Sequence, residues 1–176
     1  MSIRVAINGF GRTGRAAFRA AHESGADIEW VAINDVADPA MLAHLLTYDT
    51  VYGRFQGSVE TIDGGIVVDG HEIAMPTKSD PAELPWDELG VDVVIESTGR
   101  FRSRADAAKH LEAGARKVIV SAPAKDPDLT VARGINFYVR RPARVQLREE
   151  RTEPLGVLVV DGYRRPRLCH ADSLRK

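Results

Sequence analysis

Three glycines near the start of the chain are spaced so that their backbone can come close to a bound molecule. Gly9, Gly11 and Gly14 form the pattern Gly-x-Gly-x-x-Gly directly after a β-branched run at residues 3–7. In such a pattern the first glycine allows a tight turn, the second leaves room for a pyrophosphate, and the third lets the next helix pack on the strand. The free N–H groups at the start of that helix then face the phosphates. The spacing therefore predicts a phosphate-binding loop.

A carboxylate follows the glycines at the interval that a ribose-binding side chain needs. A second apolar run at residues 28–33 ends in Asn34 and Asp35, and Asp35 stands 21 residues after Gly14. In dinucleotide-binding folds an acidic residue about 20 positions beyond the glycines hydrogen-bonds the ribose hydroxyls. The competing interpretation is a strand–helix–strand unit whose glycines form an ordinary turn without a ligand. The glycines, the strand and the carboxylate together favour a dinucleotide site.

The elements that must position these residues alternate between strands and helices. Apolar runs typical of buried strands occur at residues 3–7, 28–33, 91–95 and 117–120, with a shorter one at 129–131. Helical patterns occur at about residues 11–23, 39–46 and 103–113, and a short helical segment is expected at 81–89. This alternation predicts an α/β fold with a doubly wound, Rossmann-type, mostly parallel sheet.

Between residues 57 and 75 the pattern changes to short alternating segments separated by Asp-Gly turns, which are a hairpin signal. The segments cover residues 57–62, 66–68 and 71–75. We expect a small antiparallel insertion in the parallel sheet. Residues 47–55, which precede it, are typical of a loop.

The helical periodicity predicts which side chains face the sheet. The inward faces are Gly14, Ala17, Phe18 and Ala21 in the first helix, Met41, Leu42, Leu45 and Leu46 in the second, and Ala105, Ala108 and Leu111 in the third. Arg12, Arg15 and Arg19 are placed off the inward face of the first helix. Ligands of doubly wound sheets bind beyond the carboxyl ends of the strands. Residues 9–14, Asp35, residues 97–99 and Ser121 all follow predicted strands, so one cleft could collect them.

Composition and charge exclude several classes of protein. The 176 residues are 44% hydrophobic and 28% charged with a formal net charge of −1, which suggests one soluble domain and points to neither nucleic acid nor membrane. No apolar run reaches the roughly 20 residues that span a bilayer, and no signal-peptide pattern opens the chain. A single cysteine, Cys169, excludes an internal disulfide, and His22, His44, His71 and His110 lack metal-ligand spacing. We expect a cytoplasmic protein.

Six short segments occur in a characteristic order and spacing, at residues 6–12, 32–35, 44–49, 53–55, 96–101 and 121–126. Together they closely resemble the cofactor-binding half of the phosphorylating glyceraldehyde-3-phosphate dehydrogenase family. The resemblance covers residues 1–137. The erythrose-4-phosphate dehydrogenase family is similar, but the segments at 97–101 and 121–125 favour the glyceraldehyde enzyme.

The resemblance implies an NAD-dependent oxidoreductase of glycolysis that acts on glyceraldehyde 3-phosphate and forms a homo-oligomer, a tetramer in the family. The cofactor-binding residues that it implies are Asn8, Gly9, Phe10, Gly11, Arg12, Thr13, Gly14, Asn34, Asp35, Ser97, Thr98, Gly99, Phe101 and Ser121. Arg12 and Thr13 would offer backbone N–H groups to the pyrophosphate, and Asp35 would accept hydrogen bonds from the adenosine ribose.

At the two ends of the cofactor, the resemblance places Thr98 and Phe101 beside the adenine ring, with Gly99 between them, and Ser121 near the nicotinamide. Two positions depart from the family pattern. Thr13 stands where Ile or Leu is usual, and residues 78–79 are Lys-Ser where Glu-Arg is common. The second departure affects one adenine-side contact.

Beyond residue 137 the chain leaves the family pattern. The family's Ser-Cys-Thr-Thr-Asn-Cys segment, which carries the nucleophile, and the histidine that activates it have no matching positions. Arginine occurs 9 times in residues 138–176 and 10 times in residues 1–137. We therefore divide the chain into an NAD-binding domain, 1–137, and a tail, 138–176. The hypothesis for the tail is translation out of frame or a truncated fusion, which re-reading the encoding DNA in the other two frames tests.

No catalytic residue is assigned. Cys169 and His170 are adjacent, point to opposite sides of an extended chain and have no evident orienting partner, so we interpret the thiol as incidental. We expect NAD binding without turnover. The alternative is a non-catalytic nucleotide-binding module whose arginine-rich tail contacts RNA or a protein partner, with residues 155–160 adding a strand to a sheet edge. The tail lacks an aromatic-rich RNA-binding motif, so nucleic acid is not expected.

Overall fold

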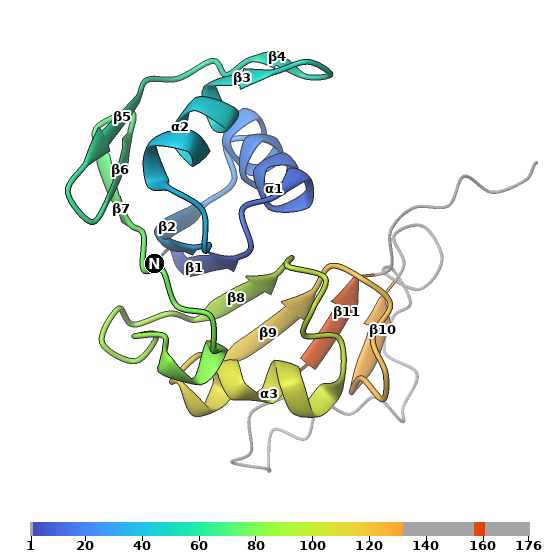
Figure 1. Ribbon diagram of the computed structural model, residues 1–176. Helices are drawn as coiled ribbons and strands as arrows, with labels where there is room; N and C mark the ends of the chain where they lie inside the picture. The colour runs from blue at the N-terminus through green and yellow to red at the C-terminus, as the bar shows by residue number, and fades with distance from the viewer. Residues whose placement is uncertain (1, 132–156, 161–176) are drawn as a thin grey trace, which may run out of the picture.

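The computed structural model describes residues 2–131 and 157–160, and its main feature is one large sheet (Figure 1). The strand order among the described residues is β10-β11-β9-β8-β1-β2-β7-β6-β5. The strands are β1 (Ile3–Asn8), β2 (Ile28–Asn34), β5 (Val59–Ile62), β6 (Gly65–Val68), β7 (His71–Ala74), β8 (Val93–Glu96), β9 (Lys117–Val120), β10 (Leu129–Val131) and β11 (Val157–Val160). A separate two-stranded hairpin joins β3 (Tyr48–Asp49) to β4 (Gly53–Arg54).

Most of the sheet is parallel, as the alternation of strands and helices predicts. β1 pairs in parallel with β2 on one side and with β8 on the other. Antiparallel pairing is confined to β5–β6 and β6–β7, and β7 joins the parallel part through the pair Ala32–Ala74. The predicted fold class, with its small antiparallel insertion, is therefore confirmed.

Helices cover both faces of the sheet, and each face has its own core. α1 (Arg12–Glu23) and α2 (Pro39–Thr47) lie on one face, and α3 (Arg104–Glu112) lies on the other, as Figure 1 shows. Successive residues of a strand point to opposite faces. Accordingly, Ile7 packs in the cluster with Phe18 and Leu46, whereas Ala6 packs in the cluster with Trp86. β1 thus contributes to both cores.

The predicted helix faces need three corrections. Arg19 is buried rather than off the packed face of α1, because its guanidinium donates to the Leu46 carbonyl oxygen at the end of α2. In α2, Met41 is exposed and Ala43 is buried, since this helix packs against both β5 and β6. In α3, which packs on β9 and the 3₁₀ turn η1 (Pro81–Glu83), Ala105 is exposed, and the residues buried there are Ala107 and His110.

Three predicted segments also differ from the structure. The helical segment expected at 81–89 is only the three-residue η1, and the loop expected at 47–55 contains the β3–β4 hairpin. A strand was expected at 155–160 on a sheet edge, whereas β11, at residues 157–160, lies between β9 and β10 and pairs in parallel with both. A continuous apolar run suits a parallel strand with neighbours on both sides. The boundary at residue 137 and the pair Cys169–His170 lie outside the described residues.

Candidate functional site

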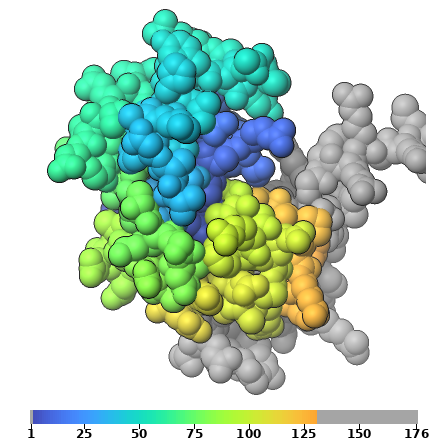
Figure 2. All heavy atoms as spheres, in the orientation of Figure 1, coloured from blue at the N-terminus to red at the C-terminus, as the bar shows by residue number. Residues whose placement is uncertain are grey.

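The carboxyl ends of β1, β2 and β8 lie side by side and open onto a pocket of about 230 Å³. β1 is the strand where the winding reverses, because α1 leads from it to β2 on one side while β8 flanks it on the other. Such a reversal is where doubly wound sheets bind ligands. The predicted site residues that line this pocket are Asn8, Gly9, Gly11, Asn34, Asp35, Ser97, Thr98 and Phe101. In Figure 2, the blue α1 segment and the yellow-green segment after β8 lie on either side of a hollow.

The remaining predicted residues lie around the pocket without lining it. Phe10 is buried, and its ring meets the edge of Phe18 with 5.9 Å between ring centroids. Arg12 and Thr13 are exposed in the first turn of α1. Gly99 belongs to the loop after β8. Ser121 follows β9, one strand further along the sheet, and its backbone N–H donates to the Glu96 carbonyl oxygen at 2.9 Å.

Each of the three glycines meets a different environment. A Cβ on Gly9, where φ is +92°, would lie 2.6 Å from the Thr98 backbone nitrogen. A Cβ on Gly14 would lie 2.3 Å from the Gly9 carbonyl oxygen. A Cβ added to Gly11, in contrast, would have no atom within 4 Å apart from those of Gly11 and its chain neighbours. Gly9 and Gly14 are therefore required by the folded chain itself, whereas the space beside Gly11 is open to a ligand.

Asp35 is fixed in position by the glycine loop and by its own turn. Its Oδ2 accepts the backbone N–H of Phe10 at 2.7 Å, and its Oδ1 accepts that of Ala37 at 3.0 Å. An ionised carboxylate has about four lone-pair sites. Two lone-pair sites therefore stay available for hydroxyl donors of a ligand after both backbone bonds have formed.

Ser97 holds the same loop from the other side. Its hydroxyl donates to the Gly9 carbonyl oxygen at 2.6 Å and lies 3.2 Å from that of Asn8. The hydroxyl proton is thus used within the protein. Ser97 lines the pocket chiefly as a support for the glycine loop.

Lys78 and Ser79 were identified from sequence only as a departure from the family pattern, yet both line the pocket. The Asn34 side chain brings them there. Its Nδ2 donates to the Lys78 carbonyl oxygen, and its Oδ1 accepts the Lys78 backbone N–H, both at 2.9 Å. Arg100 and Val36 complete the lining. Two residues with cationic side chains, Lys78 and Arg100, therefore line the pocket together with Asp35.

A buried carboxylate behind the pocket was missed by the sequence analysis. Glu96 is the last residue of β8 and is 1% exposed. It accepts a hydrogen bond from Asn8 Nδ2 at 2.5 Å and one from the Thr98 backbone N–H at 2.8 Å. The available signal was its place at the end of an apolar strand, because a carboxylate in a buried strand needs hydrogen-bond partners.

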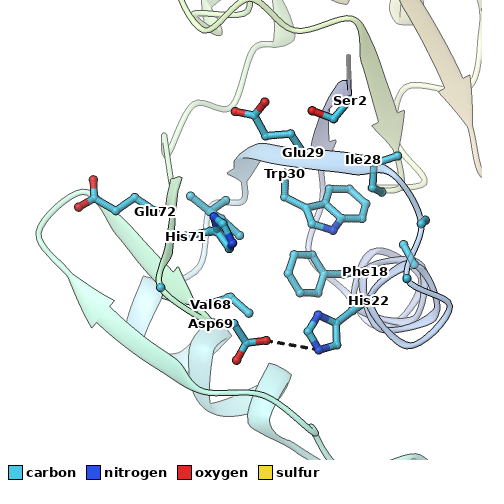
Figure 3. Close-up of a pocket in the computed structure, with 15 residues that line it drawn as sticks. Ser2, Phe18, His22, Ile28, Glu29, Trp30, Val68, Asp69, His71 and Glu72 are labelled. Atoms are coloured by element: carbon cyan, nitrogen blue, oxygen red, sulfur yellow. Dashed lines mark ion pairs between the residues drawn. The ribbon is translucent and has the colours of Figure 1, made fainter.

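A larger cavity of about 810 Å³ lies at the opposite, amino-terminal end of β2, between the end of α1 and the β6–β7 hairpin (Figure 3). Trp30 stacks on Phe18 there, with 5.0 Å between ring centroids. His22 Nε2 lies 3.4 Å from Asp69 Oδ2. None of the predicted site residues lines this cavity. Size alone therefore does not mark the site where the predicted residues converge.

Residues 2–131 and 157–160 contain no group of three or more metal-ligating side chains placed to hold an ion. Within the same ranges, no helix has the length and apolar character needed to cross a bilayer.

Comparison with known proteins assigns residues 3–104 to the family described as glyceraldehyde 3-phosphate dehydrogenase, NAD binding domain. Over 143 residues the chain is 57% identical to a glyceraldehyde-3-phosphate dehydrogenase of Streptomyces coelicolor, covering 81% of this chain and 43% of that protein. It is 56% identical over 136 residues to the enzyme of Geobacillus stearothermophilus, covering 77% and 40% respectively. The Thermotoga maritima enzyme is 56% identical over 140 residues, covering 79% and 42%. The chain thus spans less than half the length of these relatives.

Proposed function

The chain belongs to the family of NAD-binding domains of glyceraldehyde-3-phosphate dehydrogenase, and from this premise we propose that the pocket at the ends of β1, β2 and β8 holds NAD. The pyrophosphate lies against Gly11 and the first turn of α1, where N–H groups of Arg12 and Thr13 are unpaired by the helix. The Asp35 carboxylate accepts hydrogen bonds from the adenosine ribose.

The adenine ring lies between Thr98 and Phe101, and the nicotinamide end extends toward Ser121. The observation that carries this assignment is the open space beside Gly11, the one glycine of the three at which a Cβ would meet no protein atom. Gly11 has φ −70°, which any residue can adopt, so the turn itself does not require a glycine at this position. Lys78 and Ser79, which stand where the family pattern has Glu-Arg, line the same pocket.

The family reaction is the oxidation of glyceraldehyde 3-phosphate. A cysteine thiolate adds to the aldehyde to give a thiohemiacetal, a hydride passes to NAD, and phosphate then cleaves the thioester. This chain supplies the side of the reaction that binds and orients the cofactor. No residue of it matches the family's nucleophile or base, so by itself it binds NAD without oxidising the aldehyde.

We propose further that the protein is cytoplasmic and forms a homo-oligomer, a tetramer in the family that it resembles. The β3–β4 hairpin supports assembly, because Tyr48, Val51 and Tyr52 are 52%, 82% and 66% exposed. Apolar side chains gathered on a projecting hairpin are typical of a surface that a partner covers.

Isothermal titration calorimetry of the purified chain with NAD tests the binding site directly. We expect one NAD per chain and a marked loss of affinity in Asp35→Ala. Undetectable binding by a folded wild-type chain would contradict the proposal.

A further inference from the structure

The two carboxylate oxygens of Glu96 have different partners: one bonds to Thr98 in the pocket lining, and the other bonds to Asn8 and to His110 of α3. Its Oε1 accepts both the backbone N–H and the hydroxyl of Thr98, which lines the pocket. Its Oε2 accepts Asn8 Nδ2 at 2.5 Å and lies 3.0 Å from His110 Nε2. Four donors thus converge on one buried carboxylate, which is the condition under which burying a charge is tolerated.

Trp86 determines which nitrogen of His110 carries the proton. The indole Nε1–H, which can only donate, lies 2.9 Å from His110 Nδ1. Nδ1 must therefore accept, so the proton lies on Nε2 and points at Glu96. Both side chains are fully buried, so bulk solvent reaches neither of them. The hydrogen bonds consequently run in one direction, from Trp86 through a neutral His110 to Glu96.

Thr98 transmits the position of Glu96 to the glycine loop. A Cβ on Gly9 would lie only 2.6 Å from the Thr98 backbone nitrogen, so the backbones of the two loops are in contact. The Thr98 hydroxyl oxygen also accepts the Arg100 backbone N–H at 3.1 Å. A shift of Glu96 would therefore move the adenine wall and the phosphate loop together.

Asn8 extends this hydrogen-bond network from Glu96 to Asn34, at the end of β2. Because its amide nitrogen donates to Glu96, its amide oxygen is left to accept Asn34 Nδ2, at 2.7 Å. Asn34 in turn holds the backbone of Lys78 through two hydrogen bonds. The segments that follow β1, β2 and β8, together with Lys78, are thus connected through one carboxylate.

We propose that Glu96 is a positioning residue for NAD, and that Trp86 and His110 fix the acceptor character that this role requires. The proposal rests on the proposed function of the pocket. Glu96 does not line the pocket, so it acts on the cofactor only through Thr98 and Asn8.

Replacing Glu96 by Gln isolates this role, because the side chain keeps its volume while one acceptor oxygen becomes an NH₂ donor. On the Thr98 side the new donor would face a backbone N–H. On the other side it would face Asn8 Nδ2 and His110 Nε2–H. His110 could relieve the conflict by moving its proton to Nδ1, but the Trp86 indole N–H occupies that position. Removing the indole donor should therefore free His110 to accept.

The experiment compares NAD affinity by calorimetry in the wild-type chain, Glu96→Gln, Trp86→Phe and the double variant. We expect Glu96→Gln to weaken NAD binding at least tenfold and Trp86→Phe to weaken it by no more than about threefold. The double variant should bind NAD at least threefold more tightly than Glu96→Gln. If the three residues only packed, losing the indole would not repair the loss at Glu96, and the double variant would bind NAD no more tightly than Glu96→Gln. Affinity of Glu96→Gln within twofold of wild type, or a double variant weaker than Glu96→Gln, overturns the proposal.

Glu29→Gln is the matched control, since Glu29 pairs with Arg4 on the surface at 2.6 Å and should leave NAD affinity unchanged. If a variant fails to fold, ¹⁵N spectra of the wild-type imidazoles still decide, with the His110 signals identified by the proximity of its ring to the Trp86 indole proton. A proton on Nε2 and an accepting Nδ1 support the proposal, and the opposite tautomer overturns it. A wild-type chain that binds no NAD contradicts the proposed function, while these spectra still test the hydrogen-bond direction separately.

Discussion

Gly9 and Thr98 lie in backbone contact, so that a single methyl group on Gly9 would stand 2.6 Å from the Thr98 nitrogen. The loop after β1 and the loop after β8 are therefore one packed unit, although nearly ninety residues separate them in the chain. This contact explains why the phosphate side and the adenine side of the proposed NAD site have fixed relative positions. It also separates the roles of the three glycines.

Gly11→Val should abolish NAD binding while leaving the chain folded. Its Cβ meets no protein atom within 4 Å, so the added side chain occupies the space proposed for the pyrophosphate. Calorimetry with NAD and urea unfolding measure the two effects. Gly14→Ala is the contrasting variant, because its Cβ would collide with the Gly9 carbonyl oxygen and should cost about 2–3 kcal/mol of stability. Unchanged NAD affinity in folded Gly11→Val would remove the glycine loop from the site.

NAD should bind more tightly than NADP, because a 2′-phosphate would meet the Asp35 carboxylate. Asp35→Ala should weaken NAD binding and narrow the difference between the two cofactors, as Lys78 in the same pocket is then no longer opposed by this carboxylate. Calorimetric titrations with both cofactors measure the change. Asp38→Ala, an exposed carboxylate three residues away, is the control. Wild-type affinity for NADP equal to that for NAD would refute the assignment of Asp35.

Acid should weaken the segment that carries Lys78 and Ser79. The Ala82 backbone N–H and then the Lys109 ammonium group lower the pKa of Asp80 below its ordinary value of 3.8. A lowered pKa in the folded state means that the carboxylate stabilises the fold above about pH 4, and that this contribution is lost as the pH falls through the folded value. Asp80→Asn should therefore flatten the decline of the urea midpoint between pH 5 and pH 3, whereas Asp63→Asn in the β5–β6 turn should not. Parallel declines in all three proteins would contradict this role.

Addition of glyceraldehyde 3-phosphate and phosphate to the chain with NAD should produce no NADH. NAD should nevertheless raise the melting temperature, since a ligand at 100 times its dissociation constant stabilises the folded state by about 2.7 kcal/mol. Absorbance at 340 nm and thermal unfolding measure the two expectations on one sample. NADH formation that disappears in Cys169→Ser would assign catalysis to the tail.

Local spacing was sufficient to predict the fold class and the convergence of Gly9, Gly11, Asp35 and Thr98 on one pocket. Ser121, which the same argument included, follows β9 and does not line the pocket. Strand ends of a parallel sheet share an edge, so residues that follow successive strands become neighbours without any long-range information. The family resemblance added Phe101, which also lines the pocket. Which of these residues contact the cofactor stays a prediction.

What periodicity could not predict depends on contacts between distant elements. Arg19 was placed off the packed face of α1, yet the carbonyl oxygens of Leu46 and Gly53 accept its guanidinium and cover it. In the same way, nothing in the pattern of α3 indicates that His110 lies between Trp86 and Glu96. A polar residue on a helix is buried where its partners come from other elements, and the helical period contains no information about those partners.

The chain has two tryptophans, and the fold places them on opposite faces of the sheet, each beneath its own helix layer. Trp30 packs in the cluster of Phe18 and Leu46, whereas Trp86 is fully buried in the cluster of Val91 and Val94. Intrinsic fluorescence therefore has one chromophore in each layer. Trp30 emission follows the layer of α1 and α2, and Trp86 emission follows the layer of α3. A denaturation curve recorded with either tryptophan replaced by phenylalanine thus reports one layer alone. If the two curves coincide, both layers unfold cooperatively with the sheet between them.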